Sequence, residues 1–127
     1  IRLNGKKQPE IAWRSRSAPK MPSPILVKDE LYVVNDAGIA SCLDAKTGKL
    51  HWRERLNAEF SASPTYANGK IYFCDRNGVT HVVKPGKTLE VIAKNELDGT
   101  AHMASFAPYE KAFLIRTEKA LYRVETR

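Results

Sequence analysis

The side chains best suited to metal binding or catalysis are three histidines and two cysteines. His51, His81 and His102 form no Glu-x-x-His or His-x-x-x-His pair, so the sequence predicts no metal site. Cys42 and Cys74 form no CxxC motif, and each lies in an apolar, strand-like run. A free thiol in such a run behaves as a small buried hydrophobic group. We therefore expect two buried thiols that do not bond to each other.

Serine nucleophiles are not predicted either. A catalytic serine requires an activating base or a Gly-x-Ser-x-Gly elbow, and neither accompanies Ser61, Ser63 or Ser105. These serines are expected to begin strands or close turns. Because no catalytic constellation is visible, the chain is predicted not to be an enzyme.

Positive charge is concentrated near the N-terminal end. The chain has 21 Lys and Arg against 14 Asp and Glu, a net charge of +7, and its first twenty residues contain Arg2, Lys6, Lys7, Arg14, Arg16 and Lys20. A solvated arm accounts for this cluster, and contact with nucleic acid or an anionic surface is the alternative. No basic helix or aromatic ladder accompanies the cluster, so no nucleic-acid partner is predicted.

The length of 127 residues fits one domain with a core of its own. The sequence contains no apolar run long enough to span a membrane, and no signal peptide is visible. The chain begins with Ile1 and not with Met, so the removal of an upstream segment stays open.

A repeat of about forty residues determines where the histidines, cysteines and serines lie along the chain. Ser23-Pro24 recurs as Ser63-Pro64, and Leu31-Tyr32 recurs as Ile71-Tyr72. A weaker third copy contains Met103-Ala104-Ser105 and Phe113-Leu114-Ile115. Repeats of this length indicate an array of similar structural units.

Each copy reads as short strands joined by tight turns. The runs 31–34 and 71–74 are apolar at successive positions, which indicates strands covered on both faces. Asn68-Gly69 lies between two such runs and predicts a two-residue hairpin. No segment has an apolar period of 3.6 residues, so almost no helix is expected. Four strands in about forty residues are typical of a β-propeller blade.

One turn carries a longer motif, Cys42-x-Asp44-x-x-Thr47-Gly48-x-x-x-Trp52. Asp44 and Thr47 can accept hydrogen bonds from turn amides, and Gly48 can adopt the left-handed conformation that ends the turn. Trp52 then emerges on the outer strand, where its indole can lie across the boundary to the next blade.

This motif resembles the blade-docking tryptophan motif of pyrroloquinoline-quinone-like propeller repeats, Ala-x-Asp-x-x-Thr-Gly-x-x-x-Trp, with Cys42 in place of Ala. The resemblance covers residues 11–124, with Trp13 preceding the first repeat and a degraded copy of the turn at 84–87. In particular, the chain resembles the C-terminal portion of planctomycete-type secreted bacterial propellers, which often end in a strand like that at 121–124. The resemblance implies a structural docking role for Asp44, Thr47, Gly48 and Trp52.

The expected fold is all-β, a partial β-propeller of about three four-stranded antiparallel blades in a circularly shifted order. We expect one domain over residues 1–127. Its parts are an outer strand at 11–16, blades at 23–54 and 63–97, and three strands of a last blade at 106–124. Loops that enter the inner strands usually receive propeller ligands, so the candidate ligand-facing residues are Ser23, Ser61, Ser63, His102 and Ser105.

The resemblance also implies, as an alternative function, quinone-dependent dehydrogenase activity. In such enzymes the quinone lies between a tryptophan and a disulfide of adjacent cysteines, beside a calcium ion. This sequence has no adjacent cysteine pair, and its acidic residues are scattered singly, so no cofactor is predicted. The favoured function is a non-catalytic scaffold or protein-interaction module of an exported bacterial protein, secreted, periplasmic or at the cell surface. The alternative is a part of a quinone-dependent oxidoreductase.

The expected partner is a protein or a set of further blades. Three blades cannot close a ring and would expose apolar faces and strand edges. The chain is therefore expected either to be a fragment of a longer propeller or to form a homo-oligomer. In the second case, the outer strand of one copy completes the last blade of another, and two copies give six blades.

Overall fold

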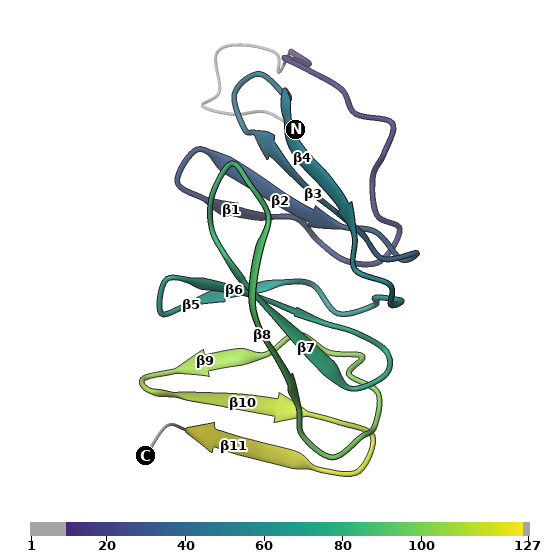
Figure 1. Ribbon diagram of the computed structural model, residues 1–127, viewed down its shortest axis with the longest axis vertical. Helices are drawn as coiled ribbons and strands as arrows, with labels where there is room; N and C mark the ends of the chain where they lie inside the picture. The colour runs from purple at the N-terminus through teal and green to yellow at the C-terminus, as the bar shows by residue number, and fades with distance from the viewer. Residues whose placement is uncertain (1–9, 126–127) are drawn as a thin grey trace.

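Three antiparallel β-sheets follow one another along the long axis of the molecule (Figure 1). The computed structural model describes residues 10–125. The first sheet contains, in chain order, β1 (Ile25–Val27), β2 (Glu30–Val34), β3 (Ile39–Asp44) and β4 (Leu50–Arg55).

The second sheet repeats this arrangement, and the third has one strand fewer. The second sheet consists of β5 (Thr65–Ala67), β6 (Lys70–Cys74), β7 (Val79–Lys84) and β8 (Glu90–Glu96). The third consists of β9 (Ala107–Tyr109), β10 (Ala112–Arg116) and β11 (Leu121–Glu125). No helix occurs within residues 10–125, and the all-β prediction is confirmed.

The repeat of the sequence is also a repeat of structure. β3 pairs with β4 through a register shift between Cys42 and Leu43, and β7 pairs with β8 through the same irregularity between Val82 and Val83. Between β5 and β6, Asn68 and Gly69 both have positive φ (49° and 71°), as a type I′ hairpin turn requires. The strands of the two sheets can therefore be compared position by position.

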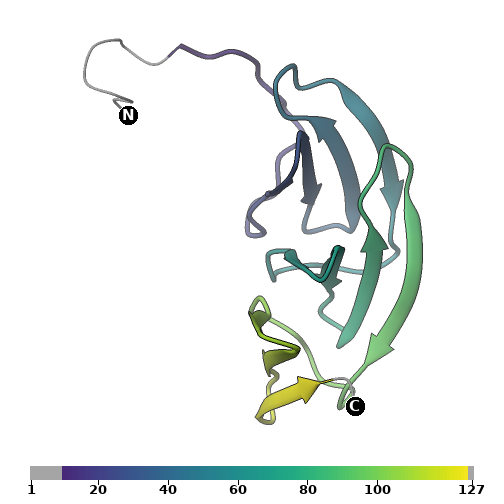
Figure 2. The same ribbon diagram turned by 90° about the vertical axis from the view of Figure 1, so that its left-hand side faces the viewer.

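The main core lies between the first and second sheets, which are stacked against each other (Figure 2). Its buried members come from both sheets and the connection between them: Val27, Tyr32, Val34, Ala40, Cys42, Trp52, Leu56, Phe60, Ile71, Phe73 and Val83. A smaller cluster joins the second sheet to the third: Ala62, Cys74, Phe106 and Ile115, with Phe113 and Tyr122 packed against it. The boundary between the second and third sheets therefore has the smaller apolar core.

One expected strand does not form. Residues 11–16 belong to no strand, although the sequence predicts an outer strand there. A strand requires a hydrogen-bonded neighbour, and within residues 10–125 each complete sheet already ends in its own fourth strand. The third sheet does end at β11 without a fourth strand, but it lies at the opposite end of the stack from this segment (Figure 1).

Candidate functional site

The turn after β3 is fixed by the side chain of Asp44. Its Oδ1 atom accepts hydrogen bonds from the backbone N–H groups of Lys46 and Thr47, at 3.1 and 2.8 Å, and from the Thr47 hydroxyl, at 2.8 Å. These bonds, first of all those from Thr47, lower the pKa of Asp44. Gly48 follows with a φ of 71°. Because glycine has no side chain, the backbone surface of the turn is uncovered at this position.

Trp13 lies on this surface. Its indole N–H donates to the carbonyl of Ala45 at 3.0 Å. A Cβ atom at position 48 would be only 2.7 Å from Cδ2 of the Trp13 ring, so only glycine at this position leaves room for the indole. The segment before the first sheet is thereby attached to the turn between β3 and β4.

Trp52 makes the same kind of contact one sheet further along. Its indole N–H donates to the carbonyl of Gly86, in the turn between β7 and β8, at 3.0 Å. The backbone N–H of Gly86 in turn donates to the Tyr32 hydroxyl at 2.7 Å, and burial raises the pKa of Tyr32 to about 12. Sequence reasoning found Trp52 and the degraded turn but missed Tyr32. Its recurrence as Tyr72 was the available signal.

The candidate ligand-facing residues make different contacts. The backbone N–H of Ser23 donates to Oγ of Ser63 at 2.8 Å, which links the starts of the first two sheets. Ser61 Oγ accepts from Nε of Arg76 at 2.6 Å, and Ser105 is exposed. His102 is buried, with 1% of its surface exposed.

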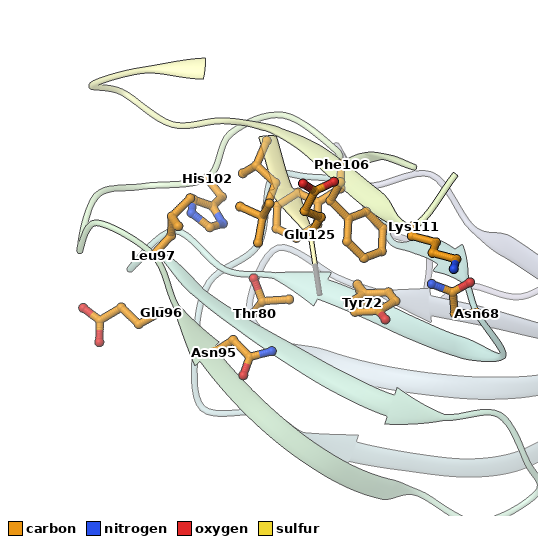
Figure 3. A pocket seen from close by; sticks show the side chains of 13 residues that line it. Asn68, Tyr72, Thr80, Asn95, Glu96, Leu97, His102, Phe106, Lys111 and Glu125 are labelled. Carbon is orange, nitrogen blue, oxygen red and sulfur yellow. The ribbon is translucent and has the colours of Figure 1, made fainter. Parts of the chain in front are cut away.

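His102 lines a cavity of about 360 Å³ between the second and third sheets (Figure 3). Neither of its ring nitrogens has a hydrogen-bond partner. Burial lowers the pKa of His102, so the imidazole is neutral near pH 7. Tyr72 and Thr80 of the second sheet and Phe106 and Phe113 of the third provide further walls.

Asp98 organises the connection from the second sheet to the third. It accepts hydrogen bonds from the hydroxyl groups of Thr100 at 2.6 Å, Thr117 at 2.7 Å and Tyr122 at 3.0 Å. These donors, first of all Thr100, hold the pKa of Asp98 well below its usual range. The sequence signal for part of this network was the Asp-x-Thr spacing, which favours a side-chain-capped turn.

A buried ion-pair geometry joins His81 to Asp75. Nε2 of His81 lies 2.8 Å from Oδ2 of Asp75, and both side chains are almost fully buried. Oδ1 of Asp75 accepts the backbone N–H groups of Asn77 and Val79, both at 2.9 Å. This arrangement holds the turn between β6 and β7. Asp75 directly follows β6 and His81 lies in β7, and sequence reasoning did not detect the pair.

Cys42 and Cys74 are free and buried, and burial raises their pKa values to about 11 and about 12. The prediction that both thiols are buried is confirmed. Within residues 10–125, no three His, Cys, Asp or Glu side chains gather as a metal site would require. The same residues include no helix with the length and apolar character needed to cross a membrane.

The repeated sheets and the indole contacts occur in a chain that resembles known proteins in sequence and in fold. A family described as outer membrane protein assembly factor BamB matches residues 4–106. The chain belongs to this family. No curated protein matches the sequence.

Two solved structures share the fold. BamB from Moraxella catarrhalis superposes with a TM-score of 0.67 at 12% identity, covering 80% of this chain and 32% of that one. Quinohemoprotein alcohol dehydrogenase from Comamonas testosteroni superposes with a TM-score of 0.61 at 12% identity, covering 77% of this chain and 17% of that one. The prediction of a partial, pyrroloquinoline-quinone-like β-propeller is confirmed. The chain spans less than a third of the length of either structure.

Proposed function

We propose that this chain is a non-catalytic part of a β-propeller and that a further β-strand pairs with the open edge of its third sheet. The observation that carries the proposal is the third sheet, which ends at β11 where the other two sheets continue to a fourth strand. The edge of such a sheet presents unpaired backbone N–H and C=O groups, which a further strand can pair with.

The side chains of β11 support the addition of a strand. Leu121 is 74% exposed and Val124 is 37% exposed, although both belong to a strand of a packed sheet. Exposed apolar side chains beside an open backbone edge favour association with another chain or segment. The partner is therefore a β-strand, from further blades or from another copy.

The segment 11–16 is the complementary part. The Trp13 indole N–H donates a hydrogen bond to the turn that follows β3. The Trp52 indole of β4 donates in the same way to the turn between β7 and β8 of the next sheet. This correspondence supports the proposal that residues 11–16 are the outer strand of a preceding blade. We propose that Asp44, Thr47, Gly48 and Trp52 form the docking motif that seats each blade on the next.

The first test is the mass of the folded chain in solution. We expect light scattering to report two or more copies, or a complex with a partner that supplies blades. A stable, well-folded monomer of 14.3 kDa without a partner would refute the proposal.

A second test uses proline within the segment 11–16. Arg14→Pro and Ser15→Pro are suitable because both side chains are exposed and neither residue lies in a sheet. Proline removes a backbone donor, and adjacent residues of a strand direct their N–H groups to opposite sides. One of the two variants should therefore weaken assembly much more than the other, with unchanged circular dichroism. Equal assembly of both variants and the parent chain would contradict strand pairing.

We further propose that the protein works outside the cytoplasm, in the periplasm or at the cell surface. The support is the description of its family, which concerns the assembly of outer membrane proteins. Immunodetection in fractionated cells tests this location, and recovery only with the cytoplasmic fraction would contradict it.

The alternative is a part of a quinone-dependent oxidoreductase. Its support is the fold shared with the dehydrogenase, which at 12% identity concerns architecture alone. The two buried cysteines are not adjacent in sequence and so offer no disulfide of the kind expected for that cofactor. Titration with pyrroloquinoline quinone and calcium should produce neither a spectral change nor dye reduction. Stoichiometric binding with dye reduction would favour the oxidoreductase.

A further inference from the structure

The second sheet carries a small side chain at the position that Trp52 occupies in the first sheet. In the first sheet, Trp52 pairs with Cys42 immediately before the register shift. At the same point in the second sheet, Ala93 pairs with Val82. A methyl group therefore stands at the position of the indole. The second boundary also contains a cavity of about 360 Å³, which other residues line, among them His102, Thr80 and Tyr72.

A second replacement puts a polar ring into the same boundary. Met103-Ala104-Ser105 corresponds to Ser61-Ala62-Ser63, so His102 corresponds to Phe60. Phe60 is fully buried among apolar side chains, whereas His102 is equally buried but offers two ring nitrogens without a partner. Buried polar atoms are hydrogen-bonded in the great majority of cases. The two unpartnered nitrogens in a cavity wall therefore indicate that something hydrogen-bonds to them.

The other walls specify the chemistry of that group. Phe106 lies 5.6 Å from the His102 ring, and Tyr72 and Phe113 meet edge to face at 4.7 Å (Figure 3). The Thr80 hydroxyl has only the Cys74 sulfur as a distant partner, at 3.9 Å, so its oxygen can also accept a hydrogen bond. A planar apolar ring suits the aromatic walls, and a donor group on that ring suits the imidazole and the hydroxyl.

Charge around the cavity favours a neutral group. Glu96, Glu125 and Lys111 line the cavity, and all three are exposed, so their fields are largely screened by water. The buried imidazole is neutral and offers one donor and one acceptor. The volume is at the lower end of the range for small-molecule sites.

We propose that this cavity binds a neutral aromatic group of the size of indole or phenol, whose N–H or O–H donates to the unprotonated ring nitrogen of His102, with the Thr80 hydroxyl as a second acceptor. The chemistry is shared by a free small molecule and by a tryptophan or tyrosine side chain on a neighbouring strand. The site shares Val124 and Glu125 with the β11 edge, but binding there requires no backbone hydrogen bond from that edge.

The test is calorimetric titration of the protein with indole and with toluene, which lacks the donor. We expect indole to bind more tightly than toluene to the parent chain. In His102→Phe, which installs the residue of the preceding repeat, indole affinity should fall about tenfold, the size expected for one lost hydrogen bond. Toluene affinity should not fall. His51→Phe, a half-buried histidine outside the cavity, is the matched control and should bind both probes like the parent chain.

Two further measurements make the outcome decisive. His102→Phe should also raise the melting temperature, because it removes buried polar atoms that lack partners in the unliganded protein. If that variant does not fold, Thr80→Val tests the same contact and should lower indole affinity without affecting toluene. Equal affinity of indole and toluene for the parent chain, or indole binding that survives His102→Phe unchanged, would overturn the proposal.

A peptide distinguishes the two sources of the aromatic group, a free small molecule and a side chain of a neighbouring strand. An acetylated peptide of residues 10–16 carries Trp13, and its Trp13→Ala counterpart is the control. Indole binding supports a small-molecule site, and tryptophan-dependent binding of the peptide alone supports a side chain of a neighbouring strand. Binding of neither probe would refute the site.

Discussion

Replacement of Trp52 by alanine should remove most of the coupling between the first and second sheets. The indole is 8% exposed, its ring centroid lies 6.2 Å from that of Tyr32, and its N–H is bonded to the Gly86 carbonyl. Burial of an aromatic side chain removes about 200 Å² from water, worth roughly 5 kcal/mol at 25 cal/mol per Å², of which alanine retains about 1 kcal/mol.

The lost hydrogen bond adds little to this figure. The Tyr32 hydroxyl lies 3.4 Å from the same Gly86 carbonyl and can replace the indole donor. We therefore expect Trp52→Ala to lower the free energy of unfolding by about 3–5 kcal/mol, the usual range for a large buried aromatic residue. Trp52→Phe keeps a ring but loses the donor and should cost about 1–2 kcal/mol.

Trp13 provides the matched comparison. It donates the same kind of bond to a turn carbonyl, but its indole is only half-buried and no sheet covers it within residues 10–125. Trp13→Ala should therefore cost less than half as much as Trp52→Ala. Urea unfolding followed by circular dichroism, at one fixed protein concentration, measures both. A loss below about 1 kcal/mol for Trp52→Ala, or equal losses for the two variants, would refute the docking argument.

Three further outcomes are expected. The pKa of Asp98 is depressed in the folded state, so its stabilising contribution is present above the unfolded pKa of about 3.9 and is lost as pH falls through the folded pKa. In Asp98→Asn, the free energy of unfolding should therefore depend less on pH below about pH 4. An unchanged pH dependence would contradict this. Cys42 and Cys74 should resist alkylation in the folded chain and react on unfolding, and a mass two hydrogens low without reductant would reveal a disulfide. Gly48→Ala should destabilise more than Gly69→Ala, since both have a φ of 71° but only position 48 is covered by an indole; equal melting temperatures would argue against that contact.

The strands and turns were predictable because they depend on local patterns. Asn68-Gly69 identifies a hairpin without any tertiary information, and the successive apolar residues of 31–34 and 71–74 identify strands covered on both faces. The turn after β3 was visible because Asp44, Thr47 and Gly48 act within one turn.

The contacts between sheets were not predictable in the same way. The hydrogen bond from the Gly86 N–H to the Tyr32 hydroxyl joins residues of different sheets that are far apart in the sequence. The strand expected over 11–16 failed for a related reason, because local propensity does not provide a pairing partner.

The two boundaries between sheets differ in a way that connects stability with binding. The first is filled by Trp52 and Phe60, and the second has Ala93 and His102 at the corresponding positions, so both replacements loosen the same boundary. The third sheet also lacks a fourth strand, and it is therefore the part of the described chain held by the smallest apolar core. A group that occupies the cavity or a strand that pairs with β11 adds contacts where the fold has fewest. Either event should stabilise the third sheet more than the first two, because binding energy at a weakly held element is gained only when that element is folded.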